Sequence, residues 1–206
     1  DTSSWSFFPN GVDKEFINLS LVRRSHSQHI KTILYAGNIG NGQGLEMVLP
    51  DVAKCMGSGY RFLVIGGGSA SSKLINAIKK ENINNIEILP PVKRDKLMAH
   101  YQDADILFLH LNDIPAFKRV LPSKIFEYTA LRKPIVAGLR GYSAQFMADN
   151  VPNSIVFEPG DVEGCVDAIR KIEKLDVKNE VRDVFVKKYA REKIMNRMAE
   201  HIFSVL

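Results

Sequence analysis

The feature that most constrains the fold is a regular alternation of short apolar runs with segments of helical periodicity. Strands that are buried on both faces read as nearly continuous apolar runs, and helices between them return the chain to the same edge. The order therefore predicts an α/β fold in which helices cover both faces of a parallel sheet. The expected strands are 33–39, 60–65, 86–89, 105–111, 134–139 and 154–157, and the expected helices are 45–56, 71–81, 94–102, 123–131, 144–149 and 162–175.

The chain has 206 residues, of which 45% are hydrophobic, enough for one substantial core. It begins with Asp1 and carries no signal-peptide pattern, so we expect a piece of a longer protein. We divide it into a connector from a missing N-terminal domain (1–31), a ligand-binding domain (32–178) and a C-terminal helix (179–206). The basic face of that helix suits a membrane surface, but its modest charge density favours packing on the domain with the basic face in solvent.

The formal charge of +5 and a pI near 9.1 suit an anionic ligand or a membrane surface. No nucleic-acid-binding signature accompanies the charge, and no apolar run is long enough to span a bilayer. Cys55 and Cys165 lie in apolar helical patterns and are expected to be buried, reduced thiols. The composition thus predicts a cytoplasmic protein, with peripheral contact at the inner face of the membrane as an open alternative.

Two glycine-rich loops follow expected strands, where ligands bind in such sheets. Residues 36–44 read AGNIGNGQG and lead straight into a helix, an arrangement that lets backbone approach a pyrophosphate. The loop lacks the Gly-Lys-Ser/Thr ending of a Walker motif. Residues 66–71 give only the first glycines of a dinucleotide fingerprint, so we expect close packing there in preference to NAD binding.

The most specific stretch is 121–136, LPSKIFEYTALRKPIV, which joins a polar helix entrance to an apolar helix and a buried strand. Ser123 is expected to cap the helix, its first N–H groups to face an anion, and Lys124 to add a full charge. Glu127 follows one turn later, where a carboxylate can accept hydrogen bonds from sugar hydroxyls. The alternative without a ligand is an ordinary capped helix with a surface lysine and glutamate.

Several motifs occur here in a shared order: PNGVD near the start, YAG with its glycine loop, FLVIGGG, ADI, and above all PSKIFEY followed by KPIV. In that order they resemble the C-terminal half of a GT-B glycosyltransferase of family 4. The nearest likeness is to the N-acetyl-L-fucosamine transferase-like enzymes of bacterial surface polysaccharide (O antigen) synthesis. The resemblance implies a Rossmann-like domain that binds a nucleotide-sugar donor and faces an acceptor-binding N-terminal domain. It also implies a retaining enzyme, with a glycan or lipid-linked acceptor.

The resemblance also implies site residues. Glu127 corresponds to the glutamate that binds the ribose, and the helix entrance around Pro122, Ser123 and Lys124 to the diphosphate site. The family's loop beside the distal phosphate and sugar corresponds to Gly37, Asn38 and Gly40, and the loop bordering the base to Pro91 and Val92.

Two departures from the family pattern concern charge. Where many members carry a glutamate eight positions before the ribose glutamate, this chain has Arg119, so Asp113, Lys118 or Arg119 is expected to take part in sugar recognition. The arginine and lysine that flank the family's first glycine loop are replaced by Asn38 and Gln43. We therefore expect Lys124 and Arg119 to be the catalytic cations that neutralise the departing diphosphate.

Other polar residues receive weaker assignments. Asp103-Ala104-Asp105 matches the Asp-x-Asp of metal-dependent glycosyltransferases but precedes a strand, so we interpret it as structural. His110 ends a strand near the expected site, and we favour a satisfied boundary histidine over a ligand contact. No other histidines show metal-ligand spacing.

The sequence thus predicts the donor-binding half of a retaining glycosyltransferase that uses a UDP-sugar, with no cofactor and no metal. The fragment alone is expected to bind donor without transferring it. Two alternatives stay open: an enzyme similar to UDP-N-acetylglucosamine 2-epimerase, for which we find no acid–base residues, and a non-catalytic nucleotide-binding module.

Overall fold

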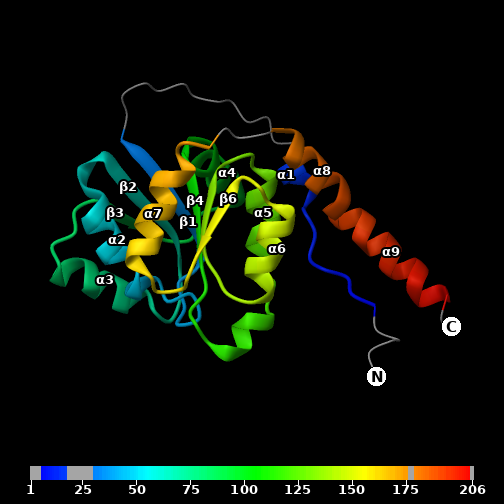
Figure 1. The fold of residues 1–206 in the computed structure, drawn as a ribbon, viewed down its shortest axis with the longest axis horizontal. Helices are drawn as coiled ribbons and strands as arrows, with labels where there is room; N and C mark the ends of the chain where they lie inside the picture. The colour runs from blue at the N-terminus through cyan, green and yellow to red at the C-terminus, as the bar shows by residue number, and fades with distance from the viewer. Residues whose placement is uncertain (1–5, 18–29, 176–178, 205–206) are drawn as a thin grey trace.

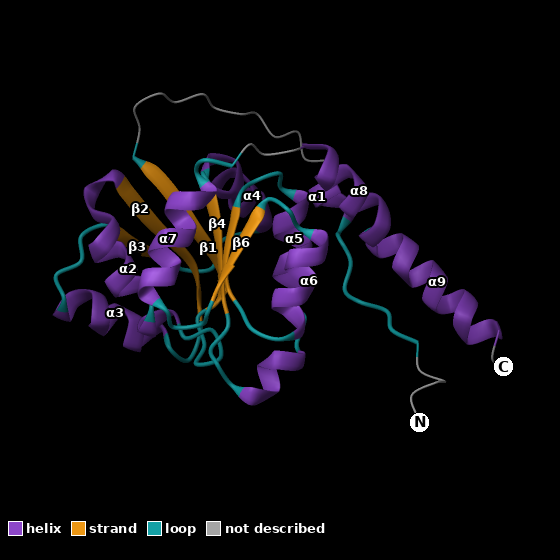
Figure 2. Ribbon diagram, viewed as in Figure 1, coloured by secondary structure: helices purple, strands orange, loops and turns teal. Residues whose placement is uncertain are grey.

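The computed structural model describes residues 6–17, 30–175 and 179–204. Their centre is a six-stranded parallel sheet in the order β3-β2-β1-β4-β5-β6 (Figures 1 and 2). The strands are β1 (Lys31–Asn38), β2 (Tyr60–Gly67), β3 (Ile86–Leu89), β4 (Ile106–His110), β5 (Ile135–Gly138) and β6 (Ser154–Phe157). Each lies within two residues of its expected bounds, which confirms the α/β class.

The strand order reverses direction between β1 and β4. The chain builds outward from β1 to β3 and then crosses back, so that β4 pairs with the other side of β1. The chain leaves β1 for helices on one face of the sheet and leaves β4 for helices on the other face. In α/β sheets, ligands bind outside the carboxyl ends of the strands at such a point.

Helices cover both faces, and alternate strand residues face opposite layers. On one face, α2 (Leu49–Met56), α3 (Ser71–Lys80) and α7 (Val162–Ile172) pack on residues such as Ile33, Val64 and Phe108. On the other face, α4 (Arg94–Asp103), α5 (Ser123–Ala130) and α6 (Tyr142–Asn150) pack on Leu34 and Leu107. Short 3₁₀ turns are η1 (Leu45–Met47), η2 (Gly57–Gly59) and η3 (Pro115–Arg119). The expected helix 45–56 is thus interrupted at Val48.

The N-terminal segment is more than a connector. It forms α1 (Lys14–Ile17), whose Phe16 is buried, and Val12 pairs with Ala190. That pairing divides the expected C-terminal helix into α8 (Asn179–Tyr189) and α9 (Arg191–Ser204). The Val12 N–H donates to the Tyr189 carbonyl (2.8 Å), and the Arg191 N–H donates to the Val12 carbonyl (2.9 Å). The Arg191 N–H therefore bonds to another segment in place of the preceding helical turn, which ends the helix.

A buried arginine fixes α8 to the sheet domain. Arg182 donates to the carbonyls of Ala130 (2.8 Å), Phe16 (3.1 Å) and Ile17 (2.9 Å), so it joins the end of α5 to α1. Aromatic rings of α5, α6 and α8 also pack on one another and join these helices. Figure 1 shows α9 continuing beyond this contact, away from the sheet.

Both cysteine thiols were expected to be buried, and only one of them is. Cys165 is buried, and burial raises its pKa to about 12, but Cys55 is exposed. Cys55 falls on the outer face of α2, whose buried side is formed by Val52, Ala53 and Met56. Among the described helices, none is both long and apolar enough to cross a membrane.

Candidate functional site

The candidate site lies at the carboxyl ends of β1 and β4, where the loops after both strands touch. The Asn112 N–H donates to the Gly42 carbonyl (2.8 Å). The Phe117 ring lies against Gly42 so closely that a Cβ there would be 2.9 Å from the ring. At Gly42 a side chain is therefore excluded, because the loop after β4 packs directly on the backbone there.

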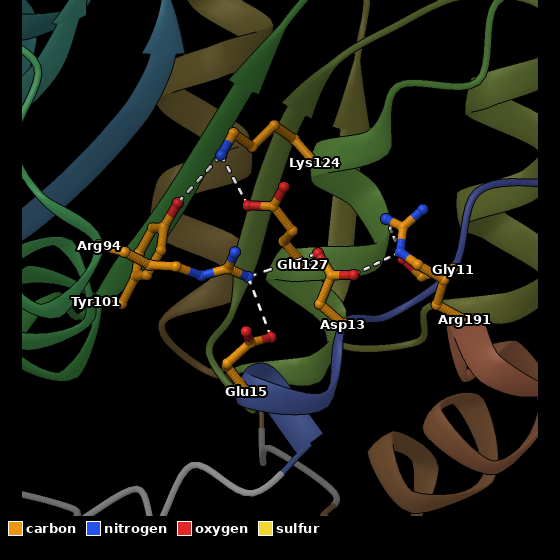
Figure 3. A network of polar contacts seen from close by, with 8 residues as sticks. All are labelled: Gly11, Asp13, Glu15, Arg94, Tyr101, Lys124, Glu127 and Arg191. Atoms are coloured by element: carbon orange, nitrogen blue, oxygen red, sulfur yellow. Dashed lines mark hydrogen bonds and ion pairs between the residues drawn. The ribbon is translucent and has the colours of Figure 1, made fainter.

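The entrance of α5 stands directly beside the end of β1. The Cε atom of Lys124 would lie 3.6 Å from a Cβ on Gly37. The Lys124 ammonium donates to the Glu127 carboxylate (2.7 Å) and to the Tyr101 hydroxyl (3.4 Å), and Figure 3 shows the three side chains converging. The exposed fractions of the Lys124 and Glu127 side chains are 25% and 21%. Of the residues expected at the site, the structure thus places Lys124 beside Gly37 and in contact with Glu127.

The expected cap of α5 is wrong. Pro122, with extended backbone (ψ 136°), occupies the N-cap position, and Ser123 is already the first helical residue. A residue that already has helical backbone cannot turn its hydroxyl back to accept the N–H groups of the first turn, as an N-cap residue does. No side-chain cap covers α5 in the structure, so first-turn N–H groups are available to an anion.

The loop after β1 is closed by neutral amides. The Asn38 side-chain NH₂ donates to the Gln43 amide oxygen (2.9 Å), which also accepts the Gly40 N–H (3.1 Å). The Tyr35 hydroxyl donates to the Asn38 carbonyl (2.6 Å). The two positions where the family usually has charge therefore bond to each other and shape the loop.

The second glycine loop packs beside the first, as expected. A Cβ on Gly66 would be 1.9 Å from the Gly37 carbonyl oxygen, and one on Gly68 would be 2.5 Å from the Ile39 carbonyl oxygen. Between them, Gly67 faces Pro91, with 3.6 Å between a Gly67 Cβ and the proline ring. Pro91 is exposed at the same edge as the candidate site.

The loop residue Val92, also expected to border the base, is half-buried and packs against the core. Its side chain therefore contributes to the support of this loop.

Sequence reasoning missed two tyrosines beneath the loop. The Tyr128 hydroxyl accepts the Ala36 N–H (3.0 Å), and Tyr101 contacts Lys124. Burial raises the pKa of both phenols, so they stay neutral. The signal for Tyr128 was its place inside the PSKIFEY motif. The signal for Tyr101 was weaker: it is the one Phe, Tyr or Trp residue in an otherwise polar helix.

The remaining expected residues are placed apart from this cluster. Arg119 lies at the exposed end of η3, and no ion pair links it to another described residue. Asp113 pairs with Arg140 (2.6 Å) and more distantly with Lys118 (3.9 Å). Asp113 and Lys118 are thus engaged in an ion-pair cluster at the η3 loop.

His110 and Asp105 are structural here, as favoured from the sequence. The Gly160 N–H donates to Nε2 of His110 (3.1 Å), so Nδ1 carries the proton and donates to the Gln43 carbonyl (2.5 Å). Burial lowers the pKa of His110. Asp105 accepts the Thr32 N–H (2.8 Å) at the opposite end of the sheet. The described residues contain no cluster of metal-ligating side chains.

Comparison with known proteins agrees with this geometry. The family model "Glycosyl transferases group 1" matches residues 23–193. The chain belongs to this family. A protein of Escherichia coli (strain K12), named "Putative colanic acid biosynthesis glycosyl transferase WcaI", is 29% identical over 143 residues, which cover 68% of this chain and 35% of that protein.

Solved glycosyltransferases share the fold at low identity. The lipopolysaccharide outer core galactosyltransferase WaaB superposes with a TM-score of 0.74 at 14% identity, over 98% of this chain and 56% of WaaB. HepE of Anabaena, solved with UDP and glucose, has a TM-score of 0.69 at 15% identity, over 85% of this chain and 48% of HepE. The Rossmann-like domain therefore corresponds to about half of a GT-B structure, and the chain spans about a third of its curated relative.

Proposed function

We propose that this chain is the donor-binding half of a retaining family 4 glycosyltransferase that takes a UDP-sugar, in bacterial surface polysaccharide synthesis. One observation carries the proposal: Lys124 and Glu127 lie beside Gly37 at the point where the strand order reverses. A cation, free helix N–H groups and a carboxylate lie within one helical turn, which suits a diphosphate next to a ribose. HepE, a structural neighbour, was solved with UDP and glucose.

In this proposal the α5 entrance and Lys124 hold the diphosphate, and Glu127 accepts the ribose hydroxyls. Negative charge grows on the diphosphate as the sugar departs, and Lys124 stabilises that charge more than it stabilises the intact donor. The proposal assigns this charge stabilisation to protein groups.

The acceptor, a glycan or a lipid-linked sugar, belongs in the proposal to a second domain. WaaB and HepE are about twice as long as the part that matches this chain. The N-acetyl-L-fucosamine transferase-like specificity and a cytoplasmic location stay part of the proposal, and two free thiols agree with the latter.

Calorimetric titration of the 206-residue chain with UDP, GDP and ADP tests the donor assignment. We expect weak binding of UDP and no transfer of sugar from a UDP-sugar. If correctly folded protein binds none of the three nucleotides, the donor-domain assignment is wrong. Consumption of a UDP-sugar without acceptor would favour an epimerase.

A further inference from the structure

Tyr101 is the one buried residue of α4, and its side chain points from that polar helix toward the candidate site. It has no exposed surface. The ring contacts Phe16 (centroids 6.3 Å apart) and Tyr128 (5.8 Å). A fully buried ring packed against other rings holds its hydroxyl at one fixed point.

That point is beside the ammonium of Lys124. The Tyr101 hydroxyl accepts a hydrogen bond from the Lys124 Nζ at 3.4 Å, and the Glu127 carboxylate accepts one at 2.7 Å. The two partners differ in charge: Glu127 neutralises the ammonium, whereas a buried phenol accepts a hydrogen bond and leaves the positive charge intact. Burial raises the pKa of Tyr101 and so maintains the neutral phenol.

The N-terminal segment holds this arrangement in place. The guanidinium of Arg94 lies over the Phe16 ring (5.2 Å) and pairs with Asp13 (3.5 Å) and Glu15 (3.4 Å). Figure 3 shows this network beside the cluster of Lys124, Tyr101 and Glu127. Phe16 contacts both Arg94 and the Tyr101 ring, so the network supports Tyr101 through Phe16.

We propose that Tyr101 is a positioning residue, which holds the Lys124 ammonium toward the diphosphate when the ribose engages Glu127. The inference rests on the proposed function. A ribose that takes up the lone pairs of Glu127 weakens the ion pair, and a lysine has a long, flexible side chain with several rotatable bonds. The fixed phenol then restricts the positions of the ammonium without competing for its charge.

The test combines Tyr101→Phe, which removes only the hydroxyl, with Lys124→Ala in a double-mutant cycle. UDP and uridine affinities are measured for wild type, both single variants and the double variant. Tyr189→Phe is the matched control, because Tyr189 is a buried phenol whose hydroxyl bonds to Asn150. Thermal unfolding of each variant reports on the fold.

We expect Tyr101→Phe to weaken UDP about three- to tenfold, the range for one neutral hydrogen bond, and to change uridine less than twofold. In the Lys124→Ala background the same change should have no further effect on UDP. Tyr189→Phe should leave both affinities unchanged.

Two results overturn the inference. One is an unchanged UDP affinity in Tyr101→Phe while Lys124→Ala weakens UDP; the other is an equal loss for both ligands that persists without Lys124. Absence of UDP binding by the wild type is a different outcome, because it removes the proposed function itself.

Discussion

We expect a substitution of Glu127 to weaken uridine more than UDP, and a substitution of Lys124 to weaken UDP more than uridine. The two side chains form an ion pair at 2.7 Å and keep about a quarter of their surface exposed. Removing either partner therefore does two things: it deletes a ligand contact and releases the other partner.

For Glu127→Gln, uridine should lose about 1.5 to 3 kcal/mol of binding free energy, the range for hydrogen bonds to a charged group. UDP should lose less, because the released Lys124 is free for the diphosphate; an ion pair of this exposure is worth up to about 1 kcal/mol. Lys124→Ala should leave uridine nearly unchanged and cost UDP about 1.5 to 3 kcal/mol, because the released carboxylate then faces the phosphates.

Titrations of UDP by calorimetry and of uridine by NMR, which follows millimolar binding, measure both affinities. Glu81→Gln is the control, because Glu81 pairs with Lys54 (3.1 Å) on the face of α2 and α3. If each variant changes both ligands by the same factor, the assignment of phosphate to Lys124 and ribose to Glu127 is refuted.

Three further predictions concern the stability of the fold and the effect of magnesium on UDP binding. Because burial lowers the pKa of His110 below the ordinary value of about 6.5, the unfolded chain binds more protons below that pH. The free energy of unfolding should therefore fall from pH 7 to pH 5, and less so in His110→Gln, as followed by urea denaturation. Gly66→Ala should destabilise the fold by about 1 to 3 kcal/mol in the same assay, because its Cβ would meet the Gly37 carbonyl, whereas Gly59→Ala meets nothing within 4 Å and should be nearly neutral. UDP affinity should agree within about twofold between magnesium and chelator, measured by calorimetry; strict dependence on magnesium would contradict the metal-free proposal.

The central strands were predictable because burial on both faces makes them continuous apolar runs. Every residue of β4 is buried, for example. The edge strands β3 and β6 are only partly buried, and Glu87 of β3 is exposed, yet their expected bounds of 86–89 and 154–157 match the structure because each is still a short, mainly apolar run.

Features set by distant backbone were not predictable. The break at Ala190 depends on hydrogen bonds from Val12, a residue near the other end of the chain. The start of α5 depends on the extended backbone of Pro122, which takes the N-cap position, so the helix begins one residue earlier than a Ser123 cap would place it. Local propensity indicates that a helix exists better than it indicates where the helix ends.

The candidate site was predictable as a set of motifs, but its charges were not. The Lys124 ammonium was expected to neutralise a diphosphate together with Arg119, whereas in the structure it is paired with Glu127. The loop amides of Asn38 and Gln43 bond to each other. The described site therefore presents little unpaired charge before a ligand arrives. In the proposed function, a diphosphate gains most from Lys124 when the ribose of the same molecule engages Glu127, so we expect a whole nucleotide to bind better than either of its parts.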